Sequence, residues 1–173
     1  MIEEEQLKGS YSETEAQAVY QKLKTDKAIL DFAQKFMHAD DQKITRNAFW
    51  TLTKATDEEL SSLKTIRNEL TDLVLQTDST SIRRLTMNLI VRLDMKEDDL
   101  RTDLLDFCFD HMMDVEELPG IQSLCMKQAF RMCQFYPELM EELKRTLEGM
   151  EIDYYKPAVK SVRNRILSGK LKI

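Results

Sequence analysis

Four aspartates recur at helical spacing in the second half of the chain and form its most distinctive charged pattern. Asp99, Asp103, Asp106 and Asp110 stand at i, i+4, i+7 and i+11. At about 100° per residue, a helix over Leu100 to Met112 would present them on one face, opposite an apolar face. The stripe predicts a surface that binds a basic peptide or helix, and the alternative is a solvated face that binds nothing.

A cysteine and a histidine also lie about one helical turn apart. Cys108 and His111 are close enough in sequence for a thiol and an imidazole to meet on one helix. Cys108 stands among Leu104, Leu105 and Phe107, however, where a thiol acts as a small apolar group rather than as a nucleophile. We therefore predict no catalytic residue, and we expect the chain not to be an enzyme.

No metal or cofactor site is expected. His38 and His111 are the only histidines, and the spacing of Cys108, Cys125 and Cys133 matches no zinc motif. The four glycines are isolated and form no phosphate-binding loop. The three cysteines are therefore expected to be reduced and buried.

Charge is distributed unevenly along the chain. The net charge is −6, but residues 154–173 hold six basic side chains and no acid, which leaves −12 for residues 1–153. Lys156, Lys160 and Arg163 lie on one side of the last expected helix, where they would bind nucleic acid, an acidic protein or an anionic membrane. Two alternatives involve no external partner. The cations would complement the dipole at the C-terminus of the helix, or the tail would dock on the acidic body of the same chain. No aromatic residues interleave with these cations, which argues against stacking on bases.

Composition indicates a helical, cytoplasmic chain. Glycine (4) and proline (3) are rare, whereas Leu, Glu, Lys and Met recur, which favours helices over sheets. The first residues, Met1 to Glu5, are acidic where a secretory signal would be basic. No apolar stretch approaches the roughly 20 residues of a membrane span, so we expect no membrane insertion.

Apolar residues recur at i, i+3, i+4 and i+7 along almost the whole chain, which predicts a series of amphipathic helices. Short connections predict that neighbouring helices run antiparallel as hairpins. The helices are expected after a Ser12/Glu15 capping box, over Asp26 to Met37, Ile44 to Lys54, Leu60 to Leu75 behind a Thr56/Glu59 capping box, Ile82 to Leu93, Leu100 to Met112, Ile121 to Tyr136, Pro137 to Gly149, and Pro157 to Gly169.

The hairpins repeat. Segments that begin at Ile44, Ile82, Ile121 and Ala158 align without gaps at successive offsets of 38, 39 and 37 residues. Because one hairpin cannot bury its apolar face alone, successive hairpins are expected to stack into an α-solenoid. The expected order within a single domain is 1–25 (an N-terminal cap or loose segment), 26–41 (a capping helix), 42–78, 80–114 and 118–150 (repeats), 155–169 (a C-terminal helix) and 170–173 (a basic tail).

The paired helices and their apolar first-helix core resemble HEAT repeats. SIRRLTMNLIVRLD, LLDFCFDHMMD, SLCMKQAFRMCQFYPELMEELK and VRNRIL resemble a group of small uncharacterised bacterial HEAT-like proteins, over residues 42–168. The most specific piece is Tyr136 to Leu139, between two helices. The resemblance implies an all-α, right-handed superhelix of about three hairpins with capping helices. A solenoid of this kind favours a scaffold that binds a protein or peptide on its concave second-helix surface. We also expect a monomer or a weak homodimer, since an exposed apolar first or last helix would favour dimerisation.

The alternative function is binding or repair of nucleic acid. Some HEAT-like proteins are glycosylases of alkylated DNA, which hold the duplex in a basic groove with aromatic side chains and a carboxylate. Trp50, with Arg46 and Asp57, is the one set here that is similar. The charge of −12 over residues 1–153 would repel phosphates, so nucleic acid is the less favoured partner.

Overall fold

The computed structural model describes residues 1–172, and every regular element among them is helical. The prediction of an all-α chain is confirmed. Ile173, the last residue of the predicted basic tail, lies outside the described residues. The α-helices are α1 (Glu13–Asp26), α2 (Ile29–Phe36), α3 (Gln42–Leu52), α4 (Asp57–Leu60), α5 (Arg67–Gln76), α6 (Thr80–Val91), α7 (Thr102–Met113), α8 (Pro119–Cys133), α9 (Pro137–Glu148) and α10 (Pro157–Leu167); the 3₁₀ helices are η1 (Glu4–Leu7), η2 (Ser61–Ile66), η3 (Glu97–Asp99) and η4 (Ile152–Tyr154).

The chain divides into two compact units. The N-terminal unit is Met1–Asp94 and the C-terminal unit is Met95–Ile173. The division falls between α6 and α7, inside the predicted repeat 80–114. Each unit therefore buries its own apolar side chains.

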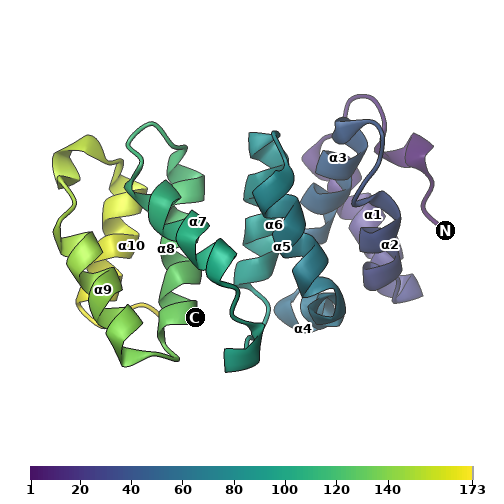
Figure 1. Ribbon diagram of the computed structural model, residues 1–173. Coiled ribbons are helices and arrows are strands. Elements are labelled where there is room, and N and C mark those ends of the chain that lie inside the picture. The colour runs from purple at the N-terminus through teal and green to yellow at the C-terminus, as the bar shows by residue number, and fades with distance from the viewer. Residues whose placement is uncertain (173) are drawn as a thin grey trace. The chain divides into compact units, whose positions relative to one another are not determined.

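In the N-terminal unit, α3 is the central helix (Figure 1). It packs against α1, α2, η1 and α6, and α6 in turn packs against α5. Phe49 and Leu52 on α3 are fully buried, as is Phe36 at the end of α2. The core of this unit therefore lies between α3 and the helices that precede and follow it.

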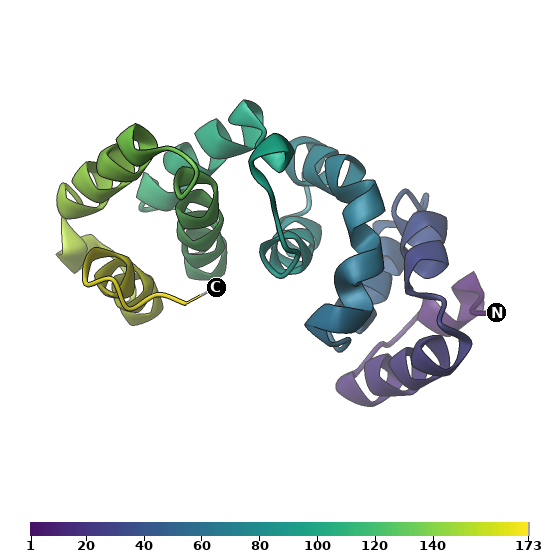
Figure 2. The same cartoon turned by 90° about the horizontal axis from the view of Figure 1, so that it is seen from below.

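In the C-terminal unit, α8 has the same central place. It packs against α7, α9 and α10, and the four helices form one group in both views (Figures 1 and 2). Pro119 and Pro137 occupy the first turns of α8 and α9, where a missing N–H costs no helical hydrogen bond. The three cysteines are buried here, in agreement with the sequence, and Cys125 and Cys133 lie on α8.

The helix starts confirm the repeat and correct its last alignment. The four first helices, α3, α6, α8 and α10, begin at residues 42, 80, 119 and 157, at intervals of 38, 39 and 38. Their third residues are all buried: Ile44, Ile82, Ile121 and Val159. Ala158, which the sequence alignment had matched to Ile121, is exposed, because the last interval is one residue longer than predicted.

One predicted helix is three separate pieces. The segment Leu60 to Leu75 comprises the end of α4, then η2, then α5. Leu60, Leu63 and Ile66 are buried at a spacing of three residues. That spacing puts them on one side of a 3₁₀ helix, with three residues per turn, but spreads them around an α-helix. The apolar pattern of residues 60–66 was therefore assigned the wrong helical period.

The N-terminal segment is more ordered than a loose cap. The predicted Ser12/Glu15 capping box is present, and α1 extends from it for 14 residues. Leu7 of η1 is fully buried. The next helix begins at Ile29 rather than Asp26, because Lys27 takes a left-handed conformation (φ 51°) that ends α1.

The corrected register of the last repeat is testable with two neighbouring substitutions. We expect Val159→Ala to lower the free energy of unfolding by about 1–3 kcal/mol, because it removes two buried methyl groups. Ala158→Ser, on the exposed side, should change it by less than about 0.5 kcal/mol. Urea denaturation followed by circular dichroism measures both changes. A larger loss of stability in Ala158→Ser than in Val159→Ala would show that residue 158, not 159, occupies the buried position.

Candidate functional site

Three of the four predicted aspartates lie on the exposed side of α7. Asp103, Asp106 and Asp110 are exposed, whereas Leu104 and Cys108 on the same helix are buried. The helix thus has the acidic and the apolar face that the spacing predicted. It is the second helix of the predicted repeat 80–114.

Asp99 does not share this face. It belongs to η3, where its carboxylate accepts a hydrogen bond from the Lys96 backbone N–H at 2.8 Å. Leu100 and Arg101 are extended, and α7 begins only at Thr102. The prediction of a four-residue stripe on one helix is wrong at Asp99, because Asp99 is the last residue of η3 and the extended residues Leu100 and Arg101 separate it from α7.

The Asp103 carboxylate is already paired. Arg101 donates to it twice, from Nε to Oδ1 at 3.0 Å and from Nη2 to Oδ2 at 2.6 Å, and the Leu104 N–H donates to Oδ1 at 2.9 Å. The Arg101 guanidinium lowers the pKa of Asp103 below its ordinary value. Within residues 1–172, Asp106 and Asp110 have no such cation. They are the uncompensated carboxylates of α7.

An apolar hollow of about 380 Å³ lies at the C-terminal end of α7. It is bounded by the loop after α7 and the loop after α9, which a hydrogen bond of 2.8 Å from the Tyr155 hydroxyl to the Met113 carbonyl ties together. The hollow is lined by Met113, Val115, Gly149, Met150, Glu151, Tyr154 and Tyr155.

The same two loops hold most of the exposed large apolar side chains of the described residues. Val115 is 50% exposed, Leu118 46%, Ile152 41% and Tyr154 69%. The sequence does not predict these exposed side chains, because a single apolar residue in a loop has no periodic pattern. The available signal was the number of large apolar side chains among the acidic residues of these two connections: Val115, Leu118, Met150, Ile152, Tyr154 and Tyr155.

The surroundings of the hollow are strongly negative. Residues 95–153 contain 15 acidic and six basic side chains, a net charge of −9. Asp110 lies three residues before Met113, so its carboxylate and the rim of the hollow are neighbours on the helix surface. An apolar hollow therefore lies next to carboxylates that have no cation of their own.

Trp50 and Arg46 line a different cavity, in the N-terminal unit. It measures about 560 Å³ and lies between α3 and α6. Asp57 takes no part in it, because its carboxylate pairs with Arg92 at 2.7 Å. The predicted set of Trp50, Arg46 and Asp57 is therefore divided, and the carboxylate that interacts with the Trp50 side chain is that of Glu13, which also pairs with Lys54.

The basic C-terminal residues are partly structural. Arg163 donates from Nε to the Leu147 carbonyl, at the end of α9, at 2.7 Å. Lys156 precedes α10 and is exposed, and Lys160 is half-buried. Leu171 is buried between Lys170 and Lys172, which are exposed. This geometry agrees with the alternative in which the tail docks on the chain itself.

Cys108 and His111 do not form a catalytic pair. The His111 ring stacks on Phe107 with centroids 3.8 Å apart, and its Nδ1 lies 2.6 Å from a Glu117 carboxylate oxygen. Cys108 is fully buried, and burial raises the pKa of its thiol well above the ordinary value. Burial and the nearby Glu142 carboxylate raise the pKa of Cys133 to about 12.

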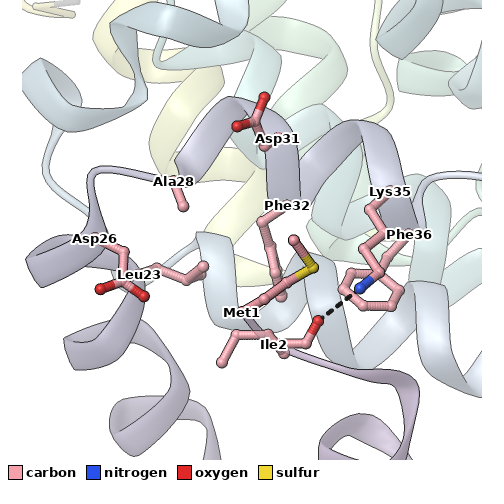
Figure 3. Close-up of a pocket in the computed structure, with 9 residues that line it drawn as sticks. All are labelled: Met1, Ile2, Leu23, Asp26, Ala28, Asp31, Phe32, Lys35 and Phe36. Atoms are coloured by element: carbon pink, nitrogen blue, oxygen red, sulfur yellow. Dashed lines mark hydrogen bonds between the residues drawn. The ribbon is translucent and has the colours of Figure 1, made fainter.

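A smaller apolar pocket of about 280 Å³ lies where the first residues cross α2 (Figure 3). Met1 and Ile2 lie over Phe32, and the Lys35 ammonium donates to the Ile2 carbonyl at 2.9 Å. The pocket has no arranged set of polar groups that would identify a ligand. Across residues 1–172, no cluster of three or more metal-ligating side chains occurs, and no helix has the length and apolar character that crossing a membrane requires.

The comparison with protein families decides what kind of chain this is. A family model described as a HEAT repeat domain matches residues 3–170. The chain belongs to the HEAT repeat family. No curated protein and no solved structure matches it. The resemblance drawn from the sequence is thereby confirmed, and this HEAT repeat protein is an all-α solenoid of the scaffold type.

The pairing of Asp103 in this HEAT repeat protein gives a titration test. Its contribution to stability is present above the pKa of the unfolded chain and is lost as the pH falls through the lower pKa of the folded state. Arg101→Gln should therefore move the Asp103 pKa up, toward the ordinary aspartate value. Carboxyl-carbon NMR titration measures the shift, Arg145→Gln on α9 is the control, and an unchanged Asp103 pKa would remove Arg101 as its cause.

The thiols give a second test. Because all three are buried and at least two have raised pKa values, thiolate is scarce at pH 8. We expect a chromogenic disulfide reagent to react slowly with the native protein and with three thiols per chain after denaturation. Rapid reaction of one thiol in the native state would instead identify a reactive cysteine.

Proposed function

We propose that this HEAT repeat protein is a non-enzymatic scaffold that binds a basic polypeptide segment on its second-helix surface. The bound segment has a large apolar side chain that enters the hollow at the end of α7, and lysines or arginines that face Asp106 and Asp110. One observation carries the proposal: exposed apolar side chains and uncompensated carboxylates lie side by side in the C-terminal unit.

The apolar part supplies most of the affinity. Tyr154 is 69% exposed and Val115 50%, so both have surface left to bury against a partner. Each Å² of apolar surface removed from water contributes roughly 25 cal/mol, and aromatic side chains at the centre of an interface are frequent hot spots. A partner side chain in the hollow would cover Tyr154 and contact Met113 and Met150 together.

The acidic part supplies selectivity. A cation at the rim of an interface adds little affinity, but it accelerates encounter and fixes the register of the bound segment. Asp106 and Asp110 are four residues apart on α7, so two cations one helical turn apart on a partner helix would match them. Asp103 contributes less, since Arg101 already neutralises it.

The same charge disfavours nucleic acid on this surface. The net −9 of residues 95–153 would repel a phosphate backbone, whose binding depends on neutralisation by lysine and arginine. An enzymatic function is also disfavoured, because Cys108 and Cys133 are buried thiols and His111 is paired with Glu117.

Selection from a random-peptide library on the immobilised protein tests the proposal. We expect the recovered peptides to share a large apolar residue flanked by lysine or arginine. In titrations with one such peptide, Asp106→Asn with Asp110→Asn should weaken binding about three- to tenfold, and by less as salt screens the charges. Tyr154→Ala should weaken it at least about tenfold, because it removes the anchor contact.

The matched control removes two charges elsewhere on the same unit. Glu138→Gln with Glu141→Gln, both exposed on α9, should leave the affinity unchanged. Recovery of acidic peptides, or equal losses in the control, would reject the proposed surface. If Tyr154→Ala instead converts a dimer into a monomer in sedimentation velocity, the hollow is a self-association surface.

A further inference from the structure

The cavity between α3 and α6 is lined by equivalent positions of two successive repeats. Arg46 and Arg84 are the fifth residues of their helices, and Trp50 and Asn88 are the ninth. Because the two helices pack side by side in the same register, these pairs face one hollow. The repeat that builds the core therefore also brings two guanidinium groups to one place.

The lining is cationic within a unit that is negative. Arg46, Lys54 and Arg84 line the cavity, and no acidic residue does, although residues 1–94 hold 16 acidic and 13 basic side chains. Lys54 is neutralised by Glu13, whose carboxylate oxygen lies 2.6 Å from its ammonium. The excess positive charge of the cavity therefore comes from the two arginines.

In the part of the chain that the structure describes, neither arginine pairs with an acidic side chain. Arg46 donates from Nε and Nη2 to the side-chain oxygen of Asn47, at 3.2 and 3.0 Å. Asn47 is itself fully buried and donates to the Leu7 carbonyl at 2.8 Å, so the guanidinium of Arg46 is held while its other N–H groups stay available. Across residues 1–172, Arg84 has no hydrogen bond or ion pair, and its side chain is exposed.

An aromatic surface stands beside the arginines. Trp50 is half-buried, and its ring meets Tyr11 edge to face with centroids 5.7 Å apart. The Tyr11 hydroxyl is fixed in turn by a hydrogen bond of 2.5 Å with the Thr51 hydroxyl. Ser81, Thr53 and Asn88 add uncharged hydrogen-bonding groups to the lining.

We propose that this cavity binds a small phosphate monoester that carries a planar ring. The phosphate dianion lies between Arg46 and Arg84, where each guanidinium can donate two hydrogen bonds, and the ring contacts Trp50. A dianion balances both arginines at once, which a single carboxylate does not. The volume of about 560 Å³ is typical of a small-molecule pocket, and the net charge of −6 disfavours a long nucleic acid.

The chain's single tryptophan makes the test direct. Trp50 is the only indole in the sequence and lines the cavity, so tryptophan fluorescence reports directly on a ligand bound there. Adenosine 5′-monophosphate should change the emission saturably and bind more tightly than adenosine or inorganic phosphate. Adenosine should bind more weakly because it has no phosphate for the two arginines, and inorganic phosphate should bind more weakly because it has no ring to contact Trp50.

Two variants and one matched control locate the site. Arg84→Gln and Arg46→Gln should each weaken adenosine monophosphate binding at least about tenfold in calorimetry, since each removes charge-assisted hydrogen bonds. Lys43→Gln removes one exposed positive charge from α3 outside the cavity, and it should leave the affinity within about twofold. Circular dichroism confirms that all three variants fold.

The alternatives are measured in the same way. A short oligoadenylate with and without a 5′-phosphate separates a free nucleotide from a strand end as the source of the monoester. Tighter, Arg84-dependent binding of a hexaglutamate peptide would overturn the proposal in favour of an acidic polypeptide. Absence of binding by adenosine monophosphate, or equal affinity in the Arg84→Gln variant, would also overturn it. The peptide-binding tests use residues of the other unit and stand apart from this result.

Discussion

A helix with one apolar face must cover that face with another helix. The repeats of this protein, and the surfaces between their helices, depend on this packing. The first helices have buried residues at matching positions, such as Ile44, Ile82 and Ile121. In the N-terminal unit α3 packs on α6, and in the C-terminal unit α8 packs on α10, so within each unit one first helix covers another. A single hairpin has no such neighbour, which is why the chain is built of repeats.

Packing in a common register has a second consequence on the outside of the helices. Equivalent positions on the outer face of neighbouring first helices also lie close together. A residue type that recurs at such a position therefore gathers at one place on the surface. Arg46 and Arg84 meet in this way on α3 and α6. Among residues 1–172, Arg101 pairs with Asp103 but no cation pairs with Asp106 or Asp110, which remain uncompensated. The fold thus makes chemically different surfaces from one repeated packing rule.

Single polar contacts between elements fix the loops that shape these surfaces. Arg92 at the end of α6 reaches back to the carbonyls of Thr53 and Ala55 and to the Asp57 carboxylate. Arg163 holds the end of α9 through the Leu147 carbonyl, and Tyr155 holds the end of α7 through Met113. In each case a long side chain donates to a backbone carbonyl at or just beyond the end of a helix, where intrahelical donors are fewest. The cavities are consequently bounded by loops of defined conformation.

The helical class, the repeat interval near 38 residues, the burial of the cysteines and the acidic side of α7 can all be predicted from the order of residues. These depend on the order of apolar and charged residues along one helix, a local property that periodicity reveals. Asp99 leaves the stripe and residues 61–66 form a 3₁₀ helix because of the conformation of their own segments, which α-helical periodicity does not resolve. The packing of helices against one another decided that Asp57 pairs with Arg92 instead of standing beside Trp50. It also decided that Val115 and Tyr154 share a hollow and that Arg46 and Arg84 share a cavity. These relations join residues about 35 to 40 positions apart, and pairing over such distances is set by which helices pack together rather than by the spacing within any of them.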